Sequence, residues 1–184
     1  MTPLYVLLTI VLIFILGFVL LYNSLITLKK RVKNAWAQID VQLKRRYDLI
    51  PNLVNAVKGY MEFEKETLQK VIEARSKAMN ASSMPEKMQA EGELGGVLSR
   101  LMAVVESYPD LKASQNVRQL MEELSNTENR ISFARQFYND LTTQFNTKIH
   151  LFPVNLVASM FNFEPFPWFE LKEPEQREAP EVNL

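Results

Sequence analysis

The sequence predicts an all-α protein, in which an N-terminal transmembrane helix is continuous with an elongated antiparallel bundle of three long helices and a short fourth. Three observations lead to this prediction. Residues 1–28 carry no charged side chain, the later apolar residues recur at steps of three and four, and β-branched runs with period-two alternation are missing. We expect an anchor over residues 1–28, a bundle domain over 29–163 and a C-terminal tail over 164–184.

The anchor is predicted from length and polarity. Residues 4–22 are apolar apart from Thr9, and at the rise of an α-helix they span roughly 29 Å, close to the thickness of a hydrocarbon core. Tyr5 and Tyr22 lie near the two ends, where aromatic belts form. A cleaved signal peptide is the alternative, but the segment lacks a basic start and a small-residue cleavage site.

Charge is distributed as a gradient although Lys+Arg and Asp+Glu both number 21. Residues 29–46 hold seven basic side chains and one acidic one, whereas residues 164–184 hold six glutamates and two basic side chains. The positive-inside rule therefore predicts that the N-terminus lies outside the membrane and the bundle in the cytoplasm. The side chains predicted to contact anionic headgroups of the bilayer are Lys29, Lys30, Arg31 and Lys33.

The bundle helices follow from apolar periodicity. The first runs on from the anchor to about residue 80, and Pro51 is expected to kink it, with a complete break as the alternative. The second covers about residues 85–107, where Gly95–Gly96 indicates a close helix contact. The third has steps of four and three from Ala113 to Lys148, a period typical of coiled-coil packing. A short fourth helix is expected near residues 154–161.

The order of these helices predicts where the C-terminal segment lies. With three long helices, residues 161–171 (FNFEPFPWFEL) should begin at the membrane-distal end of the bundle. We therefore interpret their aromatic side chains as packing over the bundle tip, rather than dipping into the same membrane. A protein partner at this tail is a further option. After Lys172 the chain is acidic and contains proline, which predicts disorder.

Catalytic chemistry finds little support. His150 is the only histidine and cysteine is absent, which argues against histidine-carboxylate di-metal sites, cysteine nucleophiles and most zinc sites. Paired glutamates occur on faces predicted to be solvated, without a substrate cleft. The basic cluster adjoins the membrane, so nucleic-acid binding is not predicted either. We expect no enzyme activity and no cofactor.

Polar side chains crowd parts of the first and third helices beside apolar stripe positions. Buried polar groups usually hydrogen-bond to one another for stability, so we favour a structural network and keep a binding groove as the alternative. The candidate residues are Asn34, Gln38, Asp40, Arg45, Arg46, Asp48, Asn52, Glu128, Asn129, Arg135 and Asn139.

Long motifs resemble the LemA family. They are RVKNAWAQIDVQLKRRYDLIPNLVNAVKGYMEFEKETL (residues 31–68), LSRLMAVVESYPDLKA (98–113), ELSNTENRISFARQFYND (123–140) and FPVNL (152–156). The resemblance covers nearly the whole chain. It implies a bacterial inner-membrane protein with one transmembrane helix and a helical bundle, and it implies no catalytic residues.

These observations predict a non-enzymatic membrane scaffold that forms a homo-oligomer and organises or shapes membrane. Confinement to a surface raises the effective concentration of subunits, so weak contacts suffice for assembly. The alternative is a membrane-tethered adaptor in signalling or protein quality control, which recruits partners through bundle grooves or the tail.

Overall fold

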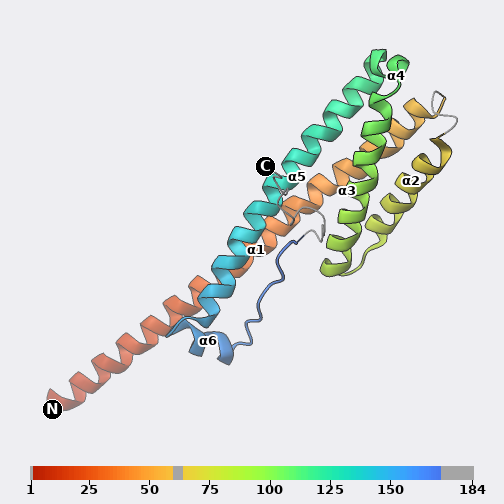
Figure 1. The fold of residues 1–184 in the computed structure, drawn as a ribbon. Coiled ribbons are helices and arrows are strands. Elements are labelled where there is room, and N and C mark those ends of the chain that lie inside the picture. Colours follow the sequence, from red (N-terminus) through yellow and green to blue (C-terminus); the bar gives the residue numbers. More distant parts are fainter. Residues whose placement is uncertain (1, 60–63, 171–184) are drawn as a thin grey trace, which may run out of the picture. The chain divides into compact units, whose positions relative to one another are not determined.

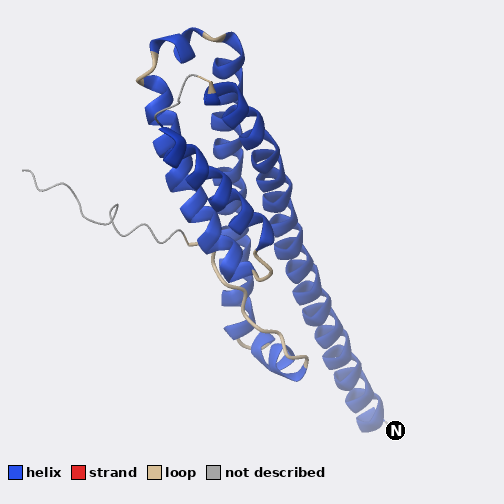
Figure 2. Ribbon diagram, turned by 90° about the vertical axis from the view of Figure 1, so that its right-hand side faces the viewer, coloured by secondary structure: helices blue, strands red, loops and turns tan. Residues whose placement is uncertain are grey.

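The structure, a computed structural model, describes residues 2–59 and 64–170, and within these ranges it contains helices and loops but no strand (Figure 1, Figure 2). The all-α prediction is therefore confirmed. The helices are α1 (Thr2–Lys58), α2 (Lys65–Asn80), α3 (Met84–Glu106), α4 (Pro109–Ala113), α5 (Gln115–His150) and α6 (Val154–Met160).

Contacts divide the chain into two units, and α1 and α5 each contribute to both. The anchor unit comprises residues 2–39 and 133–168, and the bundle unit comprises residues 40–132 with the start of the tail. The predicted disorder after Lys172 lies outside the described residues.

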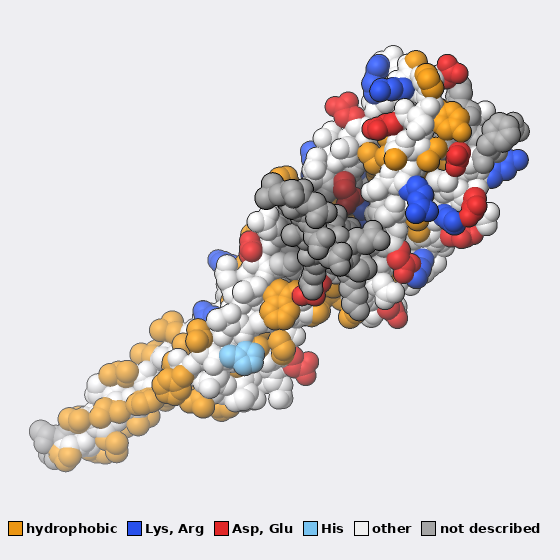
Figure 3. All heavy atoms as spheres, in the orientation of Figure 1, with side chains coloured by type: hydrophobic (Ala, Val, Ile, Leu, Met, Phe, Trp, Pro, Cys, Tyr) orange, Lys and Arg blue, Asp and Glu red, His pale blue; other side chains and the backbone are white. Residues whose placement is uncertain are grey.

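The N-terminal part of α1 is the one candidate membrane span in the described chain. Its most apolar window has a mean hydropathy of 3.1, and none of that window is buried inside the protein. Figure 3 shows hydrophobic side chains covering this end of the helix. Thr9, its single clearly polar residue, donates its hydroxyl hydrogen to the Tyr5 carbonyl at 2.9 Å, so this hydroxyl needs no partner in the lipid.

Helix α1 continues through Pro51 and ends at Lys58, so Pro51 does not break it. Proline cannot donate to the carbonyl four residues earlier, which is that of Tyr47. Arg75 of α2 donates its Nε–H to this carbonyl at 2.7 Å and replaces the missing backbone bond. The helix ends instead before Gly59, and our expectation of one helix to about residue 80 was wrong, because α2 is a separate helix.

This replacement can be tested with a double-mutant cycle. We expect Arg75→Met to lower the free energy of unfolding by about 1–3 kcal/mol, since it leaves the Tyr47 carbonyl without a donor. In a Pro51→Ala background the N–H of the alanine bonds the Tyr47 carbonyl. Arg75→Met should therefore lower the free energy of unfolding clearly less in that background. Chemical denaturation of the full chain in detergent measures both differences, and equal costs in the two backgrounds would contradict the assignment.

The separate α2 changes the order of the bundle. The described part of the bundle unit contains four long helical segments, from α1, α2, α3 and the first half of α5, and the second half of α5 belongs to the anchor unit. There Lys148 Nζ donates to Ser24 Oγ at 2.6 Å, and Trp36 packs edge-on against Tyr138 with ring centroids 5.4 Å apart. Our prediction that the C-terminal segment begins far from the anchor, at the bundle tip, was therefore wrong.

The apolar stripe of the third predicted helix forms the buried face of α5. Its members Val117, Leu124, Ile131, Tyr138 and Phe145 are all buried. The glycines of α3 behave differently from expectation, because a side chain at Gly95 or Gly96 would meet nothing within 4 Å. These glycines therefore do not mark a close helix contact. The short predicted fourth helix is confirmed as α6.

Candidate functional site: a buried charge network

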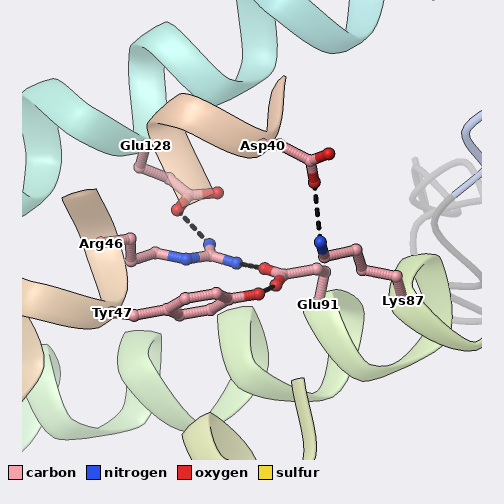
Figure 4. Close-up of polar contacts among 6 residues, drawn as sticks. All are labelled: Asp40, Arg46, Tyr47, Lys87, Glu91 and Glu128. Carbon is pink, nitrogen blue, oxygen red and sulfur yellow. Dashed lines mark hydrogen bonds and ion pairs between the residues drawn. The ribbon is translucent and has the colours of Figure 1, made fainter. Parts of the chain in front are cut away.

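The most distinctive polar feature of the bundle unit is an arginine buried among three helices (Figure 4). Arg46 of α1 and Glu91 of α3 are both fully buried and form an ion pair through Arg46 Nη2. Arg46 Nη1 bonds Glu128 Oε2 of α5 at 2.6 Å, and this second carboxylate is partly exposed. One guanidinium group therefore joins α1, α3 and α5.

Glu91 accepts a second hydrogen bond from the Tyr47 hydroxyl, so both of its carboxylate oxygens have a donor. Burial raises the pKa of Tyr47 to about 12, although the adjacent Arg46 guanidinium opposes the shift. The phenol therefore stays protonated at neutral pH and keeps donating to Glu91. A nearby pair extends the polar contacts toward solvent, where Lys87 Nζ of α3 lies 2.7 Å from Asp40 Oδ1 of α1.

The sequence explains why α1 and α3 bury these groups. Glu91 falls between Met88 and Leu94 on the apolar stripe of α3, and Arg46 lies beside Leu43 and Ile50 on that of α1. A charge at a stripe position must enter the core with the stripe. Burying an unpaired charge is costly, so each group requires the other.

Of the residues predicted to form a polar network, the structure brings together Arg46 and Glu128, with Asp40 in the neighbouring pair. Arg135 and Asn139 are half-buried in the anchor unit. The remaining predicted residues are exposed: Asn34, Gln38, Arg45, Asp48, Asn52 and Asn129.

Sequence reasoning missed Tyr47, Lys87 and Glu91 as network members. The signal for Glu91 was present, because it lies three residues from both Met88 and Leu94 in a helix with an apolar stripe. Tyr47 lies on the apolar stripe of α1, and the structure adds a role for its hydroxyl, which bonds Glu91.

The groups of this network are engaged with one another and offer little scope for catalysis or metal binding. Its carboxylates are occupied by Arg46, Tyr47 and Lys87, and the described residues contain no cluster of three His, Cys, Asp or Glu suited to a metal. A groove between α2 and α3 is lined by charges of both signs, and its Lys77 and Glu93 pair with each other at 2.5 Å. The polar groups thus bind one another and hold the helices in register.

These features define the class: a membrane-associated helical-bundle protein whose core charges are paired internally. The chain belongs to the LemA family, whose sequence model matches residues 35–184, so the resemblance found in the sequence is confirmed. The LemA family and this all-helical fold are not known as enzymes.

Curated relatives match most of the chain. Protein LemA of Metamycoplasma hominis is 31% identical over 155 residues, which cover 84% of this chain and 71% of that protein. Magnetosome protein MamQ 2 of Paramagnetospirillum magneticum is 25% identical over 185 residues, covering 86% of this chain and 68% of that protein. Magnetosome protein MamQ of Magnetospirillum gryphiswaldense is 23% identical with the same coverage.

Proposed function

We propose that this protein is a non-enzymatic, single-pass membrane scaffold that self-assembles through its helical domain and thereby organises membrane. A pair of exposed aromatic side chains carries the proposal. Phe133 and Phe137 lie one turn apart on α5 and are 72% and 49% exposed. Covering one such side chain gains about 1.5–3 kcal/mol, so water is an unfavourable environment for the pair.

A second copy of the chain is the occupant we propose for this face. Every copy on one membrane presents Phe133 and Phe137 from the same helix, and anchoring confines the copies to two dimensions. Confinement raises the effective concentration, so an interface centred on two aromatic anchors suffices. The magnetosome proteins among the relatives support the membrane-associated part of this proposal.

The test is the size of the full chain in detergent, by size-exclusion chromatography with light scattering and by electron microscopy. We expect assemblies of several copies, and Phe133→Ser/Phe137→Ser should dissociate them. The matched control is Ile72→Ser/Met79→Ser, which removes two exposed apolar side chains from α2 and should leave assembly intact. A monodisperse monomer at high protein concentration would overturn the scaffold proposal.

The adaptor alternative loses part of its basis in the structure. The aromatic side chains at the start of the tail, which could recruit a partner, are largely engaged inside the protein, since Phe166 packs on Phe145, and Phe169 is buried. Trp168 is exposed but donates its indole N–H to Thr143 Oγ1 at 2.9 Å. Deleting residues after Lys172 separates the two functions: the scaffold should still assemble, whereas an adaptor would lose its partner.

Orientation forms part of the proposal. The basic side chains that follow the span favour a cytoplasmic bundle and an external N-terminus. A reporter enzyme fused after Leu184 should therefore be active only in the cytoplasm. Activity on the outer side of the membrane would reverse the orientation without affecting the self-assembly test.

A further inference from the structure

The segment that links α5 to the C-terminal tail is unusual for a surface segment. Residues 151–163 contain no charged side chain. Phe152 is 79% exposed and Met160 67% exposed, and Leu151, Leu156 and Phe161 are also exposed. Five large apolar side chains are thus exposed within thirteen residues, which is far more than single scattered exposures.

This segment contacts the end of the candidate span. The Phe161 ring lies 4.6 Å from the Tyr22 ring and 6.0 Å from the Phe18 ring, measured between centroids. Phe18 and Tyr22 are the last turn of the apolar run. The C-terminal end of α6 therefore lies at the same level as the end of the span.

The two sides of α6 have different surroundings. Val154, Val157 and Ala158 are buried, at the spacing of one helix face. Leu156 and Met160 lie one turn apart on the other side and are exposed. Since the exposed side carries two large apolar side chains besides Ser159, an environment other than water is expected there.

A turn at the end of α6 returns the chain to the protein. Asn162 has a positive φ of 51°, and the N–H groups of Asn162 and Phe163 bond the carbonyls of Ser159 and Ala158 at 3.4 and 2.9 Å. This is a Schellman turn, and asparagine tolerates its left-handed residue. The turn directs Phe163 back toward Phe145 and Tyr22. The segment that contains α6 is therefore attached to the protein at both ends, by α5 before it and by Phe163 after it.

Charged groups near this segment mark the level of lipid headgroups. Lys29 Nζ lies 5.1 Å from the centre of the Phe163 ring, and Lys148 Nζ bonds Ser24. Lys29 lies seven residues after Tyr22, which is roughly 10 Å along the helix. Both lysines therefore stand in the headgroup region if the span ends near Tyr22.

We propose that α6 and its flanking residues 151–161 insert into the membrane interface beside the transmembrane helix and form a second lipid contact. The occupant of the exposed apolar face is the acyl-chain boundary of the bilayer. An interfacial helix of this kind lies in the plane of the membrane with its apolar face among the lipids. The inference depends on the span crossing the bilayer and is independent of self-assembly.

The chain contains no cysteine, so single-cysteine variants can carry an environment-sensitive fluorophore at one chosen position. The full chain is reconstituted into vesicles of phosphatidylcholine and phosphatidylglycerol with labels at Leu156→Cys and, separately, Met160→Cys. Gln38→Cys, on an exposed site of α1, is the aqueous control, and Leu12→Cys, within the span, is the deep control. Quenching is measured with aqueous iodide and with lipids that carry a nitroxide near the headgroup or near the chain end.

We expect the labels at positions 156 and 160 to lose iodide quenching and to be quenched best by the nitroxide near the headgroup. The Leu12 label should respond best to the deep nitroxide, and the Gln38 label to iodide. Iodide quenching at 156 and 160 equal to that at 38 would overturn the proposal. Protection from both iodide and lipid nitroxides would also overturn it, because protein would then cover the face.

Discussion

Replacing Arg46 by alanine is expected to lower the free energy of unfolding by about 3–5 kcal/mol, the usual cost of breaking a buried ion pair. The change leaves Glu91 buried with a negative charge and only the Tyr47 hydroxyl as a partner. It also frees Glu128, but that carboxylate is partly exposed and can be solvated. The loss therefore comes mainly from Glu91.

The matched control is Arg45→Ala, which removes an exposed arginine from the neighbouring position and should change stability by less than about 0.5 kcal/mol. The triple variant Arg46→Met/Tyr47→Phe/Glu91→Leu replaces the buried charges by apolar groups and should recover most of the loss. Chemical denaturation of the full chain in detergent, followed by circular dichroism, measures all three. If Arg46→Ala lowers the free energy of unfolding no more than Arg45→Ala does, the guanidinium group of Arg46 is solvated and the buried ion pair is contradicted.

Replacing Phe145 by alanine should be nearly as costly, at about 3–5 kcal/mol for a fully buried phenylalanine. Its ring lies against Phe163 and Phe166, with centroids 6.3 and 5.2 Å away. The next residue, Asn146, binds the backbone of Phe166 through both side-chain atoms, accepting from its N–H at 2.9 Å and donating to its carbonyl at 2.8 Å. Phe145 and Asn146 together hold the C-terminal segment on α5.

A second consequence of Phe145→Ala is local. Residues 161–168 should detach before the helices unfold, because the aromatic contacts that offset the entropy of ordering this segment are reduced. Limited proteolysis should then cut within 161–168 faster than in the unmodified protein. Gln144→Ala, at an exposed position one residue away, is the control and should leave both the unfolding midpoint and the cleavage rate unchanged. Equal cleavage of the two variants would show that Phe145 does not retain the segment.

Local signals in the sequence predicted the helices well and one connection badly. The ends of α3, α5 and α6 fall within two residues of the predicted ranges, because proline, serine and apolar periodicity mark them locally. Pro51 was the strongest breaker signal in the first helix, yet α1 passes through it. The reason is tertiary: Arg75, distant in sequence, supplies the hydrogen bond that proline cannot.

The same limit applied to the charge network. Periodicity placed Arg46 beside the stripe of its own helix, and it could have flagged Glu91 on the stripe of α3. Periodicity cannot say which charges on different helices meet, since that depends on how the helices are rotated and aligned. The structure selected Arg46, Glu91 and Glu128 from a longer set of polar residues.

The sequence alone determined that the chain is helical, that its first segment is a candidate membrane span and that it resembles the LemA family. Composition and period are local properties, and these conclusions depend on nothing else. Only the tertiary structure decided that α1 ends at Lys58 and that α2 is a separate helix, so that the described bundle unit holds four rather than three long helical segments. The second half of α5 and α6 then belong to the anchor unit, where Phe161 contacts Phe18 and Tyr22, because such contacts depend on how separate helices pack and not on the period of any one helix.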